Sequence, residues 1–325
     1  MHARELFCWG RTLGLPVWPA RGDSEWTSLW ERSPVTRIPL HDEPRAVAVG
    51  EEHTCVLHED GTVHCSGREG GDGRLGFEDC RVEHAVDHPV SLLAPATDIA
   101  IDDGWTCALL EDGRVECWGS PAPGVPVRCG PRLVETEAGR ALRGCARMDA
   151  GACVDAGGEV WVWGAPGGRA GTAPLRASRA EGLGRAREVA VTGEVVCVID
   201  EAGAVACTRD GAAIAAPFRG KARAIDCGGE GCCVITADGA LSCWGNPGLS
   251  AAVSGATDVR RLALSWDTLC WSTGDEHEVW CAGDAPSVFG AGARDDAASL
   301  GWDARPIPLD GRSNDPPRPP GRAER

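Results

Sequence analysis

The sequence predicts an all-β protein built as a β-propeller, and three repeated features support this prediction. A frame of two cysteines separated by nine residues occurs four times, always with a glycine six positions after the first cysteine. A short apolar segment precedes such frames, and a Trp-Gly pair follows several of them. Units of roughly 36 to 52 residues, with three short strands and glycine-rich joints, are typical of propeller blades. The four frames are Cys55–Cys65, Cys107–Cys117, Cys197–Cys207 and Cys233–Cys243.

Each frame is predicted to fold as a β-hairpin whose loop places the two cysteines opposite each other. A two-residue turn at Asp60 and Gly61 would leave Cys55 and Cys65 on opposite faces, because side chains alternate along a strand. A three-residue loop ending at Gly61 instead sets the two cysteines directly against each other. The glycine then occupies the third loop position, where a positive φ costs it little. Directly opposed residues lie within the span of a disulfide, so we predict one in every frame.

Two further units depart from this frame. The unit from Cys270 to Cys281 has one extra residue, and a four-residue loop still leaves its cysteines opposed, which predicts a fifth hairpin disulfide. The unit that begins at Cys153 is one residue shorter, so a two-residue Gly-Gly turn suffices and places Val162 opposite Cys153. Cys153 is therefore expected to be free or to bond another cysteine such as Cys145.

The segments around the hairpins complete the predicted unit. The cysteine face of the first hairpin carries Leu57 and Val63 and is expected to be buried. Small and branched residues predict a preceding strand at 47–49, 99–101, 189–191 and 262–264. Trp-Gly pairs close the units at 118–119, 163–164 and 244–245. Six fairly complete units are visible, and residues 5–10 match only the closing strand of a seventh.

One known family shares these features. The pattern V-A-V-G-x-x-H-T-C-x-L-x-x-D-G-x-V-x-C-x-G over residues 47–67, together with the Trp-Gly closures, resembles the repeats of the regulator of chromosome condensation family, in a cysteine-rich variety. The abundance of Ala, Gly and Arg suggests a bacterial source. The resemblance implies a seven-bladed propeller, which we assign to residues 1–310 as a single domain. The Pro/Arg-rich segment 311–325 is predicted to be disordered.

Charge and hydropathy exclude two classes of partner. The net charge is −16, with 48 acidic and 32 basic residues, whereas a nucleic-acid-binding protein needs a basic face. Arginines gather between residues 176 and 223, and we interpret them as a solvated loop face. No segment approaches the roughly 18 apolar residues of a membrane span, so the chain is not expected to cross a membrane.

The cysteine content favours an oxidising compartment. Seventeen cysteines are unusual in a reducing compartment, and no C-x2-C zinc motif occurs. The cluster of Cys227, Cys232 and Cys233 is interpreted as a local Cys227–Cys232 disulfide or free thiols rather than a metal site. We predict an extracellular, cell-surface or periplasmic protein. The pairing of the remaining cysteines is left open: Cys8, Cys80, Cys129, Cys145, Cys153, Cys227 and Cys232.

The N-terminal residues do not by themselves carry the signal that export to an oxidising compartment would require. Residues 1–10 contain no apolar region of the kind that a signal peptide requires. We therefore expect the true start to lie upstream, with an export or lipoprotein signal and the rest of the first blade, and a lipid anchor is expected only in that case. The alternative is an open or six-bladed ring with an unpaired edge strand.

The sequence offers no catalytic constellation, metal site or cofactor motif. The glycine-rich segment 67–76 lacks the Lys-Ser/Thr of a P-loop and is predicted to connect two strands of a blade. Trp105 and Trp266 precede hairpins, where aromatic residues in loops could anchor a partner. We therefore predict a non-enzymatic propeller that binds a protein or a surface glycan. Two alternatives stay open: nucleotide exchange on a small GTPase, which the family resemblance implies, and inhibition of a secreted enzyme.

Overall fold

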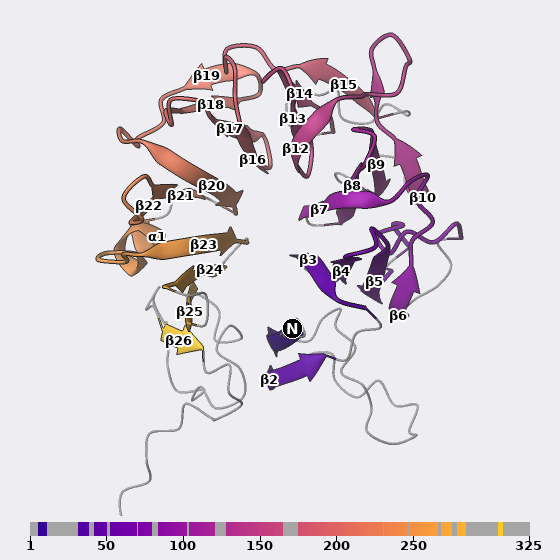
Figure 1. Ribbon diagram of the computed structural model, residues 1–325, viewed down its shortest axis with the longest axis horizontal. Coiled ribbons are helices and arrows are strands. Elements are labelled where there is room, and N and C mark those ends of the chain that lie inside the picture. Colours follow the sequence, from indigo (N-terminus) through magenta and orange to yellow (C-terminus); the bar gives the residue numbers. More distant parts are fainter. Residues whose placement is uncertain are drawn as a thin grey trace, which may run out of the picture.

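The computed structural model shows the chain as a ring of β-sheets (Figure 1). The residues that the structure describes are 6–11, 32–38, 42–50, 53–69, 71–79, 84–102, 104–120, 128–164, 175–229, 231–245, 247–265, 268–274, 278–283 and 305–307. Strands, turns and one short helix account for their regular structure, which confirms the all-β class. No helix within these ranges is long and apolar enough to cross a lipid bilayer.

Seven sheets follow one another along the chain, six of them blades and the first a pair of strands. The strands of the first three sheets are β1 (Leu6–Arg11) and β2 (Arg32–Ile38); β3 (Pro44–Val49), β4 (His53–His58), β5 (Val63–Arg68) and β6 (His84–Pro89); β7 (Ala96–Asp102), β8 (Trp105–Leu110), β9 (Val115–Gly119) and β10 (Arg128–Leu133). The next two sheets contain β11 (Glu135–Thr136), β12 (Cys145–Asp149), β13 (Ala152–Asp155), β14 (Val160–Val162) and β15 (Arg176–Arg179); β16 (Glu188–Thr192), β17 (Val195–Ile199), β18 (Val205–Arg209) and β19 (Ala212–Ile214). The last two contain β20 (Ala222–Gly228), β21 (Gly231–Thr236) and β22 (Leu241–Trp244), followed by helix α1 (Pro247–Ala252); then β23 (Val259–Leu264), β24 (Thr268–Thr273), β25 (Glu278–Gly283) and β26 (Arg305–Ile307).

The strand nearest the centre of the ring is the first strand in five blades and β12, the second, in the β11–β15 blade. Figure 1 shows these inner strands in the order β3, β7, β12, β16, β20 and β23. Each contacts the next along this order. The pair β1–β2 lies between the β23–β26 and β3–β6 blades in Figure 1. The predicted propeller therefore consists of six blades and one partial sheet, and the expected closing strand at residues 5–10 is β1.

The register of the hairpins confirms the loop argument. In the first hairpin Cys55 lies opposite Cys65, and the His58 N–H donates to the Thr62 carbonyl across the loop. Gly61 ends this three-residue loop with a φ of 84°. The other predicted pairs are also directly opposed in their sheets: Cys107 and Cys117, Cys197 and Cys207, Cys233 and Cys243, Cys270 and Cys281.

The two-residue turn predicted after Cys153 is wrong. Cys153 lies opposite Trp161, and Val162 lies opposite Ala152. The loop has three residues like the others and ends at a left-handed Gly158 with a φ of 83°. Asp155 holds this loop, because its carboxylate accepts the Gly157 N–H at 2.8 Å and the Glu159 N–H at 3.0 Å. The missing residue has therefore been lost from the strand and not from the loop.

Five of the six blades contain more than the three strands predicted for each unit, and only β20–β22 has three among the described residues. Four blades have a fourth, outer strand, and the β11–β15 sheet has a fifth that joins in parallel. Outer strands are short or carry little apolar alternation, as β19 shows with all three residues exposed. A pattern search based on burial cannot detect such a strand. The segment 67–76 does connect two strands, β5 and β6, as predicted.

The hydrophobic core lies between neighbouring blades. Between the β3–β6 and β7–β10 blades, Leu57 and Val63 pack with Ile99, Ala108 and Trp118. Similar clusters fill the following interfaces as far as β23–β25, where Leu249 of α1 joins the core. The predicted tail, residues 311–325, lies outside the described residues, so the boundary at residue 310 stays a prediction.

Candidate functional site at the ends of the inner strands

The inner strands carry arginines toward the end where they begin. Five of the six inner strands have an irregular register there, close to a bulge. We use the name arginine end for the arginines within the first three residues of an inner strand or, for Arg187, directly before the regular strand β16: Arg45, Arg147, Arg187, Arg223 and Arg261. A bulge redirects a side chain out of the regular alternation of a strand, which suits a long cationic side chain at a ring interface.

Two of these arginines fasten their blade to the next one. The Arg187 Nη2 donates a hydrogen bond of 2.9 Å to the Ala222 carbonyl, at the start of the following inner strand. Arg223 donates in turn to the carbonyl of Val259, at the start of β23. Both bonds satisfy backbone carbonyls at a blade interface. They also fix these two guanidinium groups at the interfaces between blades.

Acidic residues occupy the opposite end of the inner strands. We use the name acidic end for four residues: Asp102, Asp149, Glu194 and Asp226. Asp102 and Asp149 are the last residues of β7 and β12, Glu194 lies in the turn after β16, and Asp226 lies late in β20. Glu194 is exposed, whereas the three aspartates are partly buried.

Asp149 and Asp226 repeat one hydrogen-bonding arrangement in two blades. One oxygen of Asp149 accepts the N–H of Ala150, and the other accepts the N–H of Val191 in the next inner strand, both at 2.7 Å. Asp226 accepts the N–H of Cys227 at 2.9 Å and that of Leu264 in the next inner strand at 2.8 Å. These carboxyls therefore join neighbouring blades through backbone donors, and neither is presented as a nucleophile or general base.

The surroundings of these two carboxyls disfavour ionisation. Burial, together with the nearby Asp226 and Asp102 carboxyls, raises the pKa of Asp149 to about 8. Burial raises the pKa of Asp226 to about 7, although its two backbone hydrogen bonds oppose the change. An approaching cation would favour the ionised forms of both groups. The negative charge of the acidic end would therefore increase when a cation approaches.

At the arginine end the charges are mixed, with arginine in excess. Burial raises the pKa of Asp98, and Arg147 and Arg45 partly offset this effect. Burial also raises the pKa of Glu188, against the influence of Arg147 and Arg187. Each acid thus lies among arginines, unlike those of the acidic end. The sign of the charge therefore reverses from one end of the inner strands to the other.

The structure also locates the two tryptophans that were predicted to face a partner. The loop placement of Trp105 is wrong, because this residue begins β8 and is only 2 % exposed. Its indole packs in the core cluster that contains Met148 and Trp163, so it cannot anchor a partner at the surface. Buried aromatic residues at a strand start fill the space between blades. Trp266 lies outside the described residues.

Disulfides brace the blades around this site. The five predicted pairs are bonded in the structure: Cys55–Cys65, Cys107–Cys117, Cys197–Cys207, Cys233–Cys243 and Cys270–Cys281. Two pairings that the sequence left open are Cys145–Cys153 and Cys227–Cys232. Cys129 is also disulfide-bonded. The side chains of Cys8 and Cys80 lie outside the described residues.

Comparisons with known proteins agree with this architecture. The sequence profile of the regulator of chromosome condensation (RCC1) repeat matches residues 45–74, a segment that spans β3, β4 and β5. A search of curated proteins found no match to the chain. The chain is an RCC1-like repeat protein with a β-propeller fold.

Solved structures resemble the whole ring at low sequence identity. Human WBSCR16 superposes with a TM-score of 0.70 at 18 % identity, over 94 % of this chain and 94 % of the other. Prp20p from Saccharomyces cerevisiae, described with its binding to Gsp1p and histones, gives a TM-score of 0.69 at 16 % identity over 94 % and 86 %. The CRINKLY WD40 ectodomain of the Arabidopsis thaliana receptor kinase ACR4 gives 0.52 at 19 % identity over 75 % and 81 %. Similarity at this level concerns the fold.

Proposed function

We propose that this protein is a non-catalytic binding propeller that works outside the reducing cytosol and holds a cationic polypeptide at its acidic end. The observation that carries the proposal is the reversal of charge along the inner strands. At one end Asp102, Asp149, Glu194 and Asp226 lie at or near the ends of the inner strands of four consecutive blades, without a basic residue among the described residues of those strand ends. Strands hold the three aspartates and a two-residue turn between strands holds Glu194, so little ordering entropy is lost on binding.

The disulfides support an oxidising environment. Seven disulfides join described cysteines, and such bonds persist mainly in extracellular or periplasmic proteins. Prp20p, which shares the fold, is described with its binding to Gsp1p and histones, so a propeller of this shape can serve as a protein-binding scaffold. Nucleotide exchange on a cytosolic GTPase fits the disulfides less well. Inhibition of a secreted enzyme would be one form of the protein binding proposed here.

The raised pKa values give the proposed binding a definite pH dependence. Asp149 and Asp226 bind protons near pH 7 in the free protein, and a cationic partner favours their ionised forms. Binding therefore releases protons. The affinity is expected to increase between pH 6 and pH 8, by up to about tenfold per pH unit for each proton released.

An oligo-arginine peptide provides the probe, because its charge does not change over this pH range. Its binding to the oxidised protein is measured by fluorescence anisotropy at constant ionic strength. Glu194→Lys in the turn before β17 is expected to weaken binding about fivefold, or ~1 kcal/mol. Glu201→Lys is the matched control, because Glu201 is an exposed residue in the turn at the other end of β17.

Equal effects of the two substitutions would contradict the assignment of the acidic end. An affinity that does not change with pH would also contradict it. So would binding of a neutral glycan with an affinity that Glu194→Lys does not change. Sensitivity to Glu194→Lys alone, with affinity increasing with pH, supports the proposal.

A further inference from the structure

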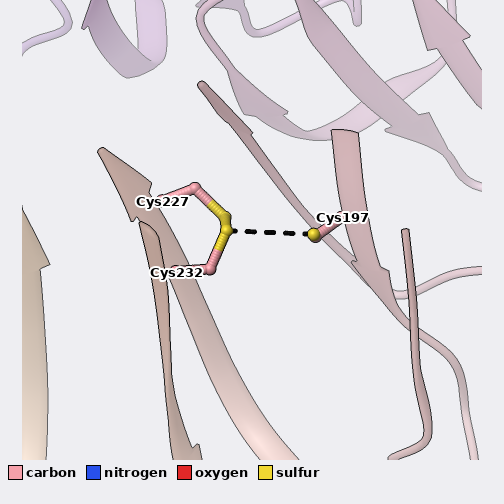
Figure 2. Close-up of side chains that lie close together, drawn as sticks. All are labelled: Cys197, Cys227 and Cys232. Atoms are coloured by element: carbon pink, nitrogen blue, oxygen red, sulfur yellow. Dashed lines mark hydrogen bonds between the residues drawn. A yellow bond between two sulfur atoms is a disulfide. The ribbon is translucent and has the colours of Figure 1, made fainter. Parts of the chain in front are cut away.

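Four cysteines of two neighbouring blades form a sulfur cluster, which we define as Cys197, Cys207, Cys227 and Cys232. Cys197 and Cys207 belong to β17 and β18, and Cys227 and Cys232 belong to β20 and β21. All four side chains are buried, with exposed fractions between 0 % and 6 %. Figure 2 shows the Cys197 sulfur directed at the Cys227–Cys232 disulfide across the blade interface.

The alternation of side chains along β21 explains the position of Cys232. Cys232 and Cys233 are adjacent in sequence, so their side chains point to opposite faces of the sheet. Cys233 bonds Cys243 within its own hairpin. Cys232 bonds Cys227 of β20 instead, and its sulfur lies 3.8 Å from that of Cys197.

The distance between the two disulfides matches the separation of sulfur ligands in a thiolate metal site, because the Cys197 and Cys232 sulfurs lie 3.8 Å apart. The Cys227 and Cys232 sulfurs are bonded to each other and separate only on reduction. The sulfurs of Cys197, Cys227 and Cys232 all lie within 4.8 Å of one another. A tetrahedral Zn²⁺ with Zn–S bonds of about 2.3 Å separates its sulfur ligands by about 3.8 Å. Among the described residues, these three cysteines form the group of at least three potential metal ligands whose ligand atoms lie within this distance of one another. Cys207, bonded to Cys197 in the oxidised protein, is adjacent as a fourth thiol.

We propose that the reduced protein binds a thiophilic metal ion such as Zn²⁺ between these two blades, and that oxidation to the two disulfides expels it. Thiolates select soft or borderline metal ions over Mg²⁺ and Ca²⁺. The surroundings are apolar, with Ala190, Val195 and Ile225 packed against the cysteines, so competing water is excluded. A bound cation also offsets the cost of burying thiolates in such a site.

The redox balance of this exchange is simple. Opening the Cys197–Cys207 and Cys227–Cys232 bonds requires four electrons and four protons, which two equivalents of a dithiol reductant supply while becoming disulfides. The metal ion then displaces protons from the thiols that it binds. Two equivalents of a disulfide oxidant take back four electrons, restore both protein disulfides and release the ion. An exported chain is synthesised in a reducing cytosol, so the ion would occupy these thiols before oxidation.

Cadmium serves as the probe, because its thiolate complexes absorb in the ultraviolet. The full-length protein is reduced without oxygen, loaded with Cd²⁺, passed through a chelating column and analysed for retained metal. The same samples are alkylated, and the protected cysteines are identified by mass spectrometry. One retained ion per chain is expected, together with selective protection of the sulfur cluster.

Two double variants test the assignment. Cys197→Ser with Cys207→Ser removes ligands from the cluster and should weaken retention by more than about tenfold, since even changes outside the ligand set cost that much. Cys55→Ser with Cys65→Ser removes a hairpin pair of the same frame in another blade and should leave retention unchanged. Absence of retained metal, equal loss in both variants, or uniform alkylation of all cysteines would overturn the proposal. Uniform alkylation includes the case in which the reduced chain loses its fold.

Discussion

Replacement of Asp149 by asparagine should change how stability depends on pH. Burial and nearby acids raise the pKa of Asp149 from 3.8 to about 8. Between these values the folded protein keeps the proton, whereas the unfolded chain has lost it. Folding therefore takes up a proton, and the contribution of this carboxyl to stability is present at low pH and lost as pH rises toward 8.

The magnitude follows from the width of this interval. Each pH unit between the two pKa values changes the free energy of unfolding by about 1.4 kcal/mol for one carboxyl. From pH 5 to pH 7, the stability of the wild type relative to Asp149→Asn should fall by about 3 kcal/mol. His53, whose pKa burial lowers to about 3, has an opposite effect below pH 6.5. This effect is common to both proteins and cancels in the difference.

Urea denaturation of the oxidised proteins at several pH values measures the difference. Asp238→Asn is the control, because a hydrogen bond from the Thr236 hydroxyl lowers the pKa of this exposed carboxyl, and it is ionised in both states above pH 5. Its stability difference from the wild type should be flat from pH 5 to pH 7. A flat or rising difference for Asp149→Asn would refute the assignment of a buried, proton-retaining carboxyl.

Three further substitutions, one of them a control, test the packing between blades. The Trp118 indole N–H donates a hydrogen bond of 3.0 Å to a carbonyl of the preceding blade, and Trp118→Phe removes this donor. The free energy of unfolding should therefore fall by about 1 to 3 kcal/mol. A loss below ~0.5 kcal/mol would contradict this role. Gly113→Ala and Gly144→Ala both place a side chain at a positive φ, which costs about 1 to 2 kcal/mol. An added Cβ at Gly113 lies 2.9 Å from the Gly144 nitrogen, whereas nothing lies within 4 Å of one at Gly144. Thermal unfolding should therefore show the larger loss for Gly113→Ala, and equal losses would contradict the contact.

The hairpins were predictable because local turn chemistry sets their register. The glycine at the third loop position fixes which residues oppose each other, so Cys55 and Cys65 could be paired without knowledge of the rest of the molecule. The same reasoning failed after Cys153, where a Gly-Gly pair permits either a two-residue or a three-residue loop. Asp155 decides between them through hydrogen bonds that the cysteine spacing does not encode.

Contacts between blades could not be predicted from the sequence pattern. Asp149 bonds the N–H of Val191, 42 residues away, and Cys197 approaches Cys232 across 35 residues. Such contacts depend on the angle between sheets, which cannot be read from the spacing of residues along the chain. Trp105 illustrates the same limit, since a residue one position after a turn can face either the solvent or the neighbouring blade. One signal was available for the acidic end: an aspartate follows the apolar part of an inner strand in three units, at Asp102, Asp149 and Asp226.

The placement of the disulfides has a consequence for how the molecule responds to mechanical load. All seven disulfides between described cysteines join strands of one sheet, whereas blade-to-blade contacts such as those of Asp149 and Arg187 are non-covalent. Cys129, in β10, is also disulfide-bonded, to a cysteine outside these seven pairs. In the part of the chain after β10, tension should therefore separate the blades, while each disulfide-closed hairpin stays a loop that cannot extend. The length released by each rupture would be correspondingly short. A ring pulled apart in this way keeps its hairpin registers and needs only to dock its blades again when the tension ends.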